Sequence, residues 1–99
     1  MAAIDQFAKK KYLNLETFRR NGQGVKTPVW FAQEGTTLYV ITMKDAGKIK
    51  RIRRDGHVNV APCTATGRLT GTWVPARARE ITDPEAAAQV NRLLDKKYG

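Results

Sequence analysis

Short runs of alternating apolar and polar residues, separated by tight turns, restrict the folds open to this chain. The residues Asn21–Gly24 form one such turn and Gly35 marks another, since Asn and Gly tolerate positive φ. Pro28 lacks the N–H needed for a ladder hydrogen bond, so its strand is expected at a sheet edge or to carry a bulge there. The period of two predicts an antiparallel meander of three strands, over residues 12–18, 25–33 and 37–43.

A strongly basic segment follows this meander. Ile49 and Ile52 lie three residues apart, which predicts a helix over residues 46–54 with one apolar stripe against a core. The other positions of this helix carry many cations: Lys48, Lys50, Arg51, Arg53 and Arg54. Such a cluster either forms a solvated face or receives an anion. A helix start offers an anion free N–H groups and the positive end of the helix dipole.

The rest of the chain adds strands and no further interior helix. Residues 57–64 are predicted as a fourth strand, and residues 68–81 as a long extended segment that a Gly and a Pro interrupt. Short helices are expected only near the ends, over residues 3–11 and from Asp83, where Asp, Pro and Glu in succession suit a helix start. A parallel sheet would need a helix between each strand pair, so the order favours a small antiparallel barrel.

Size and charge narrow the class of partner. The chain has 99 residues, so residues 1–99 are treated as a single domain with one modest core, to which a second copy could add burial. Lys and Arg number 18 against 9 Asp and Glu, a net charge of +9 that favours nucleic acid, an anionic membrane surface or a phosphorylated small molecule. The single cysteine, with no long apolar run and no signal-like start, predicts a cytoplasmic protein without a membrane span.

Catalysis by the protein's own side chains is not expected. His57 and Cys63 are the only histidine and cysteine, and they fall on one predicted strand, roughly 20 Å apart at strand rise. The sequence has no metal-ligand spacing and no Walker or Rossmann glycine signature. We therefore assign no catalytic residue and no metal site, and any enzyme activity would come from a bound cofactor.

The basic segment is the candidate site for the phosphate of such a cofactor. Thr42 closes the third strand and Lys48 lies near the helix start, so a hydroxyl and an ammonium flank that start. Nucleic-acid binding is a second interpretation, in which bases would stack on aromatic side chains: Trp30, Phe31, Tyr39 and Trp73. Because these aromatics are scattered over strand positions, core packing or a dimer interface is their favoured use.

The order of motifs resembles a known family. Residues 27–31 (TPVWF), 38–42 (LYVIT) and 47–63 (GKIKRIRRDGHVNVAPC), with a Gly-containing turn and a long strand after them, resemble the pyridoxamine 5'-phosphate oxidase-like split β-barrel superfamily. Within it, the sequence resembles most the deazaflavin (coenzyme F-420)-dependent oxidoreductases. The resemblance covers residues 12–98. It implies a mainly β fold, a six-stranded antiparallel split β-barrel with short flanking helices.

The resemblance also implies a homodimer that binds a flavin-type cofactor in grooves at the dimer interface. The protein would be an oxidoreductase that transfers a hydride between coenzyme F-420, or FMN as the alternative, and a small organic substrate. The implied cofactor-binding residues are Thr27, Pro28, Val29 and Trp30 beside the ring; Ile41 and Thr42 at a strand end; Lys48, Lys50 and Arg51 at the phosphate or acidic tail; and Ala61, Pro62 and Cys63 on the following strand.

One departure from the family bears on the choice of cofactor. The Ser-Arg-Lys of the oxidase branch stands here as Ala-Gly-Lys at residues 46–48, so two phosphate-binding side chains are missing. This weakens the case for FMN, whereas Lys50 and Arg51 suit a more anionic cofactor such as F-420. Arg53 and Arg54 are assigned to the solvated face or to a partner subunit. Two alternatives stay open: a flavin- or nucleotide-binding module without turnover, and a small basic nucleic-acid-binding protein.

Overall fold

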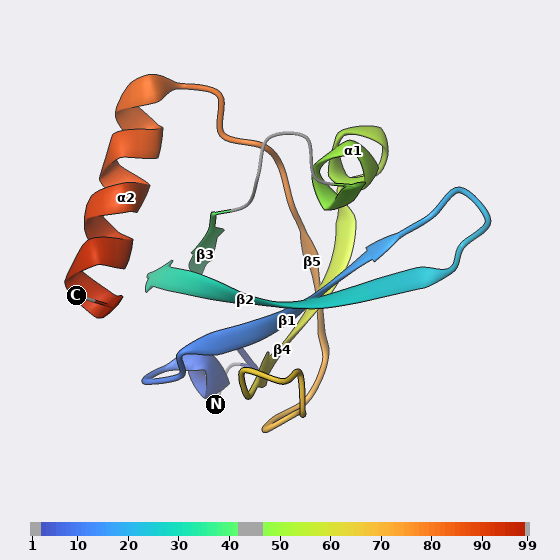
Figure 1. Cartoon of the computed structure of the whole chain (residues 1–99), viewed down its shortest axis with the longest axis horizontal. Coiled ribbons are helices and arrows are strands. Elements are labelled where there is room, and N and C mark those ends of the chain that lie inside the picture. Colours follow the sequence, from blue (N-terminus) through green and yellow to red (C-terminus); the bar gives the residue numbers. More distant parts are fainter. Residues whose placement is uncertain (1–2, 42–46, 99) are drawn as a thin grey trace.

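The computed structural model describes residues 3–41 and 47–98. Its elements, in chain order, are η1 (Ala3–Phe7), β1 (Tyr12–Phe18), β2 (Gly24–Glu34), β3 (Thr37–Val40), α1 (Gly47–Arg54), β4 (His57–Cys63), β5 (Val74–Arg77) and α2 (Pro84–Tyr98). The strands pair antiparallel in the order β3-β2-β1-β4-β5. Figure 1 shows the sheet curled, with α1 and α2 toward opposite ends. The predicted mainly β, antiparallel fold is confirmed as a curled half-barrel.

A sixth strand is not confirmed among the described residues, which form five. The predicted extended segment 68–81 is a strand only at Val74–Arg77, and one isolated β-bridge precedes it. Gln6 forms hydrogen bonds with the main chain just before β5. Its side-chain amide donates to the Thr72 carbonyl and its Oε1 accepts the Thr72 N–H, each at 2.9 Å. No hydrophobic periodicity in the sequence predicts these hydrogen bonds to the N-terminal segment.

Pro28 lies on a locally open edge although β2 is inside the sheet. On one side, β1 pairs with β2 along Gly24–Trp30. On the other side, β3 pairs only with Phe31–Glu34. The half of β2 that contains Pro28 therefore has one strand neighbour in the described part of the chain, and its missing N–H removes no ladder hydrogen bond. The predicted edge position is confirmed for this half of the strand.

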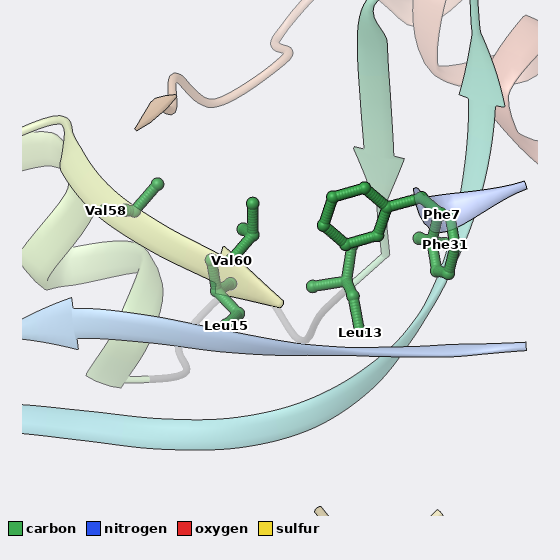
Figure 2. Packing of buried hydrophobic residues seen from close by; sticks show 6 residues of the cluster. All are labelled: Phe7, Leu13, Leu15, Phe31, Val58 and Val60. Atoms are coloured by element: carbon green, nitrogen blue, oxygen red, sulfur yellow. The ribbon is translucent and has the colours of Figure 1, made fainter. Parts of the chain in front are cut away.

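The main core lies on the inner face of the curled sheet. Figure 2 shows its six buried residues pointing toward one another: Phe7, Leu13, Leu15, Phe31, Val58 and Val60. Alternate residues of β1 and β4 supply four of them, as a period of two requires. Phe7 meets Phe31 edge to face, with ring centroids 5.8 Å apart. The N-terminal segment that carries Phe7 is a short 3-10 helix, shorter than the helix predicted over residues 3–11.

The final helix begins where the sequence predicts. Asp83 Oδ1 accepts the Glu85 N–H at 3.2 Å, which is the bond of a helix N-cap. Val90 and Leu94 are buried and pack against Ala32 of β2 in a second apolar cluster. Because Ala32 follows Phe31, which lies in the main core, α2 covers the opposite face of β2 at this end.

Candidate functional site

The helix α1 carries the basic segment and is held to the sheet by its two isoleucines. Ile49 is buried and Ile52 packs against the main core, as their spacing predicts. Cations occupy most of the remaining positions of the helix. Their contacts decide which of them hold the fold together and which are left to bind a ligand.

The two cations at the C-terminal end of α1 bind within the chain. Arg53 donates from Nε and Nη2 to the two carboxylate oxygens of Glu80, at 2.8 and 2.7 Å. Arg54 donates from Nη2 to the Phe18 carbonyl at 2.6 Å. Both arginines are exposed, as predicted for a solvated face, but each also has a partner within the chain. They tie α1 to β1 and to the segment after β5.

Three cations near the start of α1 have no carboxylate partner in residues 3–41 and 47–98. Lys48 is half-buried and Lys50 is exposed. Arg51 is half-buried, and its Nε donates to Thr17 Oγ1 at 2.7 Å. The guanidinium lies beside Gly47, where an added Cβ would be 2.9 Å from Arg51 Nη1. The terminal nitrogens of Arg51 thus lie at the first turn of α1, on the same stretch of helix as Lys48.

A hollow of about 1050 Å³, lined by both apolar and polar residues, opens on the inner face of the half-barrel. Residues of the sheet, α1 and α2 line it. Ile41 and Lys48 are both among the lining residues, so the end of β3 and the start of α1 meet at the same hollow. Two of the predicted cofactor contacts, which come from different parts of the chain, thus line the same hollow.

The remaining predicted residues flank β1. Residues 28–30 of β2 and 61–63 of β4 pair with residues 12–14 of β1 from opposite sides. At the usual strand spacing, the two motifs lie about 10 Å apart. They differ in exposure, because Trp30 is 52% exposed whereas residues 61–63 are buried. Their contact with a cofactor stays a prediction, and so does the role of Thr42, which lies outside the described residues.

Two polar residues of β1 were not among the predicted site residues. Thr17 is 1% exposed and holds Arg51. Asn14 is 5% exposed; its Nδ2 donates to the Gly67 carbonyl at 3.2 Å, and its Oδ1 has no hydrogen-bond partner among the described residues. The signal for Thr17 was its place on the apolar side of the strand, two residues after Leu15. A hydroxyl in that position needs a polar partner when it is buried.

The described part of the chain brings no nucleophile and base together. His57 is exposed at the start of β4, where it stacks on Phe18 with ring centroids 5.6 Å apart. Cys63 is buried at the other end of the same strand, and burial raises the pKa of its thiol. Three or more His, Cys, Asp or Glu side chains that could hold a metal ion do not gather anywhere in the described residues. Within those residues, no helix has the length and apolar character to cross a membrane.

Comparison with known proteins identifies the family. The sequence model of the pyridoxamine 5'-phosphate oxidase family matches residues 1–99. The chain belongs to this family. Proteins of the family commonly bind flavins. No curated protein sequence matches the chain.

Two crystal structures share the fold of this family member. The conserved hypothetical protein Rv2991 from Mycobacterium tuberculosis is 23% identical, with a TM-score of 0.78 over 96% of this chain. A proposed 5-nitroimidazole antibiotic resistance protein from Bacteroides thetaiotaomicron is 15% identical, with a TM-score of 0.80 over 98% of this chain. The chain spans 61% and 64% of the lengths of these two proteins. At such identities the likeness establishes the fold alone.

Proposed function

We propose that this protein binds coenzyme F-420, with FMN as second choice, and transfers a hydride between the cofactor and a small organic substrate. Membership of a family that commonly binds flavins supports a cofactor of this type. The observation that carries the proposal is the set of cations at the start of α1, Lys48, Lys50 and Arg51, which no described carboxylate neutralises. A phosphate with an acidic tail would supply the missing negative charge.

The first turn of α1 fits a phosphate. Gly47 has no Cβ, and Arg51 Nη1 lies in the adjoining space. The first N–H groups of a helix have no acceptor within the helix, so they can donate to a ligand. The terminal nitrogens of Arg51 can each donate to one phosphate oxygen, and Lys48 adds a point charge. Lys50, which is exposed, is the cation we assign to the acidic tail.

The ring of the cofactor would lie along residues 27–30 and the main chain at Ile41. The bound cofactor supplies the hydride chemistry, and the protein binds the phosphate and orients the ring. A homodimer is part of the proposal, as is a sixth strand that completes the barrel. Trp30 and Ile41 are each 52% exposed, and a partner subunit would cover such large apolar side chains.

Parallel titration of the purified protein with F-420 and with FMN, followed by fluorescence, tests the proposal. We expect saturable binding of both, with the lower Kd for F-420. Tighter binding of FMN would reverse the choice of cofactor. Binding of neither would contradict the proposal. Retention of DNA that falls steeply with salt, together with no binding of either cofactor, would instead favour a basic nucleic-acid-binding protein.

A cofactor-binding module without turnover is the second candidate. His57 and Cys63 lie at opposite ends of β4, so these two side chains do not form an acid–base pair. Reduced cofactor bound to such a module would keep the absorbance spectrum of its reduced form when candidate electrophilic substrates are added. An oxidoreductase would instead show substrate-dependent reoxidation of the cofactor.

A further inference from the structure

Arg51 is oriented by a buried hydroxyl on a neighbouring strand. Thr17 lies on the inner side of β1 and is 1% exposed. Its Oγ1 accepts the hydrogen bond from Arg51 Nε at 2.7 Å, across 34 residues of sequence. Because Thr17 lies in a strand paired at this position with β2, its oxygen has a fixed place. The bond therefore sets the direction of a long side chain that would otherwise sample many rotamers.

Among residues 3–41 and 47–98, this bond at Nε leaves Nη1 and Nη2 of Arg51 without a hydrogen-bond partner. A guanidinium has five N–H donors, of which Nη1 and Nη2 carry four. With Nε occupied by Thr17, these two nitrogens can still contact two oxygens of one phosphate. Helix side chains lean toward the N-terminus, and the guanidinium accordingly lies at Gly47, one turn before Arg51.

The absence of a side chain at Gly47 provides the space for this arrangement. An added Cβ would lie 2.9 Å from Arg51 Nη1, so the end of the arginine side chain would have to shift. Because Gly47 has no side chain, it leaves room for the guanidinium in the orientation that the hydrogen bond to Thr17 sets. Two residues from different elements favour the same orientation of one cation.

We infer that Thr17 is a positioning residue for the cofactor phosphate, because it directs the terminal nitrogens of Arg51 toward the start of α1. This inference rests on the proposed function, since it names how one ligand of the proposed phosphate site is oriented. Thr17 itself does not contact the phosphate and acts only through Arg51. A pre-oriented arginine loses less rotamer entropy when the anion binds, and this lowers the Kd.

The substitution Thr17→Val tests the inference, because it keeps the shape of the buried side chain and removes the hydroxyl. We expect the Kd for FMN to rise about five- to tenfold, the size of effect expected for one charge-assisted hydrogen bond. The Kd for riboflavin, which has the same ring without the phosphate, should change by less than about twofold. The same comparison applies to F-420 and its ring system without the phosphate and tail. Thr17→Ser should restore the wild-type Kd.

Two controls separate positioning from a general effect on the fold. Thr70→Val changes an exposed threonine in the same way and should leave both Kd values unchanged. In an Arg51→Ala background, Thr17→Val should cause no further loss of FMN affinity, because the group it orients is absent. Should Thr17→Val fail to fold, Gly47→Ala is the second test. It displaces the guanidinium and should weaken FMN binding while leaving riboflavin binding unchanged.

The outcomes distinguish this inference from the proposed function. Wild-type protein that binds neither FMN nor F-420 overturns both. Wild-type protein that binds FMN more tightly than riboflavin, together with an unchanged Kd in Thr17→Val, overturns the inference alone. An equal rise of the Kd for FMN and riboflavin also overturns it, because Thr17 would then act on the fold as a whole.

Discussion

The ring of Tyr98, in the last turn of α2, stacks on the ring of Trp30 in β2, with centroids 4.3 Å apart and planes inclined by 6°. The Tyr98 hydroxyl lies at the end of the β1–β2 ladder, where it accepts the Phe31 N–H at 3.0 Å and donates to the Lys11 carbonyl at 2.5 Å. Lys11 and Phe31 would form the next pair after Tyr12 and Trp30. The hydroxyl therefore takes the place of a ladder bond and anchors α2 to the sheet.

Removal of this hydroxyl should loosen α2. We expect Tyr98→Phe to keep the stack on Trp30 and to lower the free energy of unfolding by about 1 kcal/mol, because the Phe31 N–H loses its acceptor. Tyr98→Ala also removes the stack and should lower it by a further ~1 kcal/mol or more. Urea unfolding followed by circular dichroism measures both values. Equal stability of Tyr98→Phe and wild type would show that the hydroxyl does not anchor the helix.

The same hydroxyl should make stability fall at alkaline pH. Burial raises the pKa of Tyr98 above its ordinary value of 10.0; a Coulombic effect of Tyr12 adds to the shift and the Phe31 backbone bond opposes it. The folded chain then holds a proton that the unfolded chain releases, so the contribution is complete below pH 10 and is lost as pH rises through the folded-state pKa. Unfolding free energies from pH 8 to 11 should fall less steeply for Tyr98→Phe than for wild type.

The neighbouring lysine acts in the opposite direction and needs its own control. Burial lowers the pKa of Lys97 from its ordinary value of 10.5, so near this value the unfolded chain binds more protons and stability rises with pH. Lys97→Arg keeps the charge without titrating in this range. It removes the opposing effect of Lys97, so the free energy of unfolding should fall more steeply with rising pH. Identical pH profiles in wild type and Tyr98→Phe would contradict the assignment of the fall to Tyr98.

Local sequence patterns predicted the strands and the helix whose ends are set by residues close to them in the sequence. The strand over residues 12–18, the fourth strand and the helix start after Asp83 match because alternation and capping act over a few residues. The roles of Arg53 and Arg54 could not be predicted in this way, since their partners lie 27 and 36 residues away. In the site, charge density pointed to α1, but only the structure shows which of its cations the fold already uses.

The break before β5 yields a stability prediction. A Cβ at Gly71 would lie 2.5 Å from Cγ of Pro62 and would also clash with Oε1 of Gln6, the atom that accepts the Thr72 N–H. The Pro62 ring cannot move aside as a flexible chain would, so Gly71→Ala should lower the free energy of unfolding by about 1–3 kcal/mol. Thermal unfolding provides the measurement, and Thr70→Ala, at the exposed neighbouring position, is the matched control. A Gly71→Ala variant as stable as that control would refute the close approach.

The buried thiol at the end of β4 yields a prediction about reactivity. Cys63 is 5% exposed and burial raises its pKa, so little thiolate is present at neutral pH. We expect a thiol-specific reagent to label the native protein at least about a hundredfold more slowly than the protein unfolded in urea. Fast labelling of the native protein would show that this end of β4 is open. In that case Cys63 would be accessible to a bound cofactor.

Lys48 is the residue whose substitution bears most directly on the proposed site. It is half-buried beside the hollow, and no described carboxylate pairs with it, so Lys48→Ala should cost little stability. It should raise the Kd for F-420 about tenfold, because one charge-assisted contact to the phosphate is lost. Lys96→Ala removes an exposed lysine of α2 and changes the net charge equally, so it separates a local contact from long-range attraction. An equal effect of the two substitutions would assign the affinity to net charge, and an unchanged Kd in Lys48→Ala would exclude Lys48 from the site.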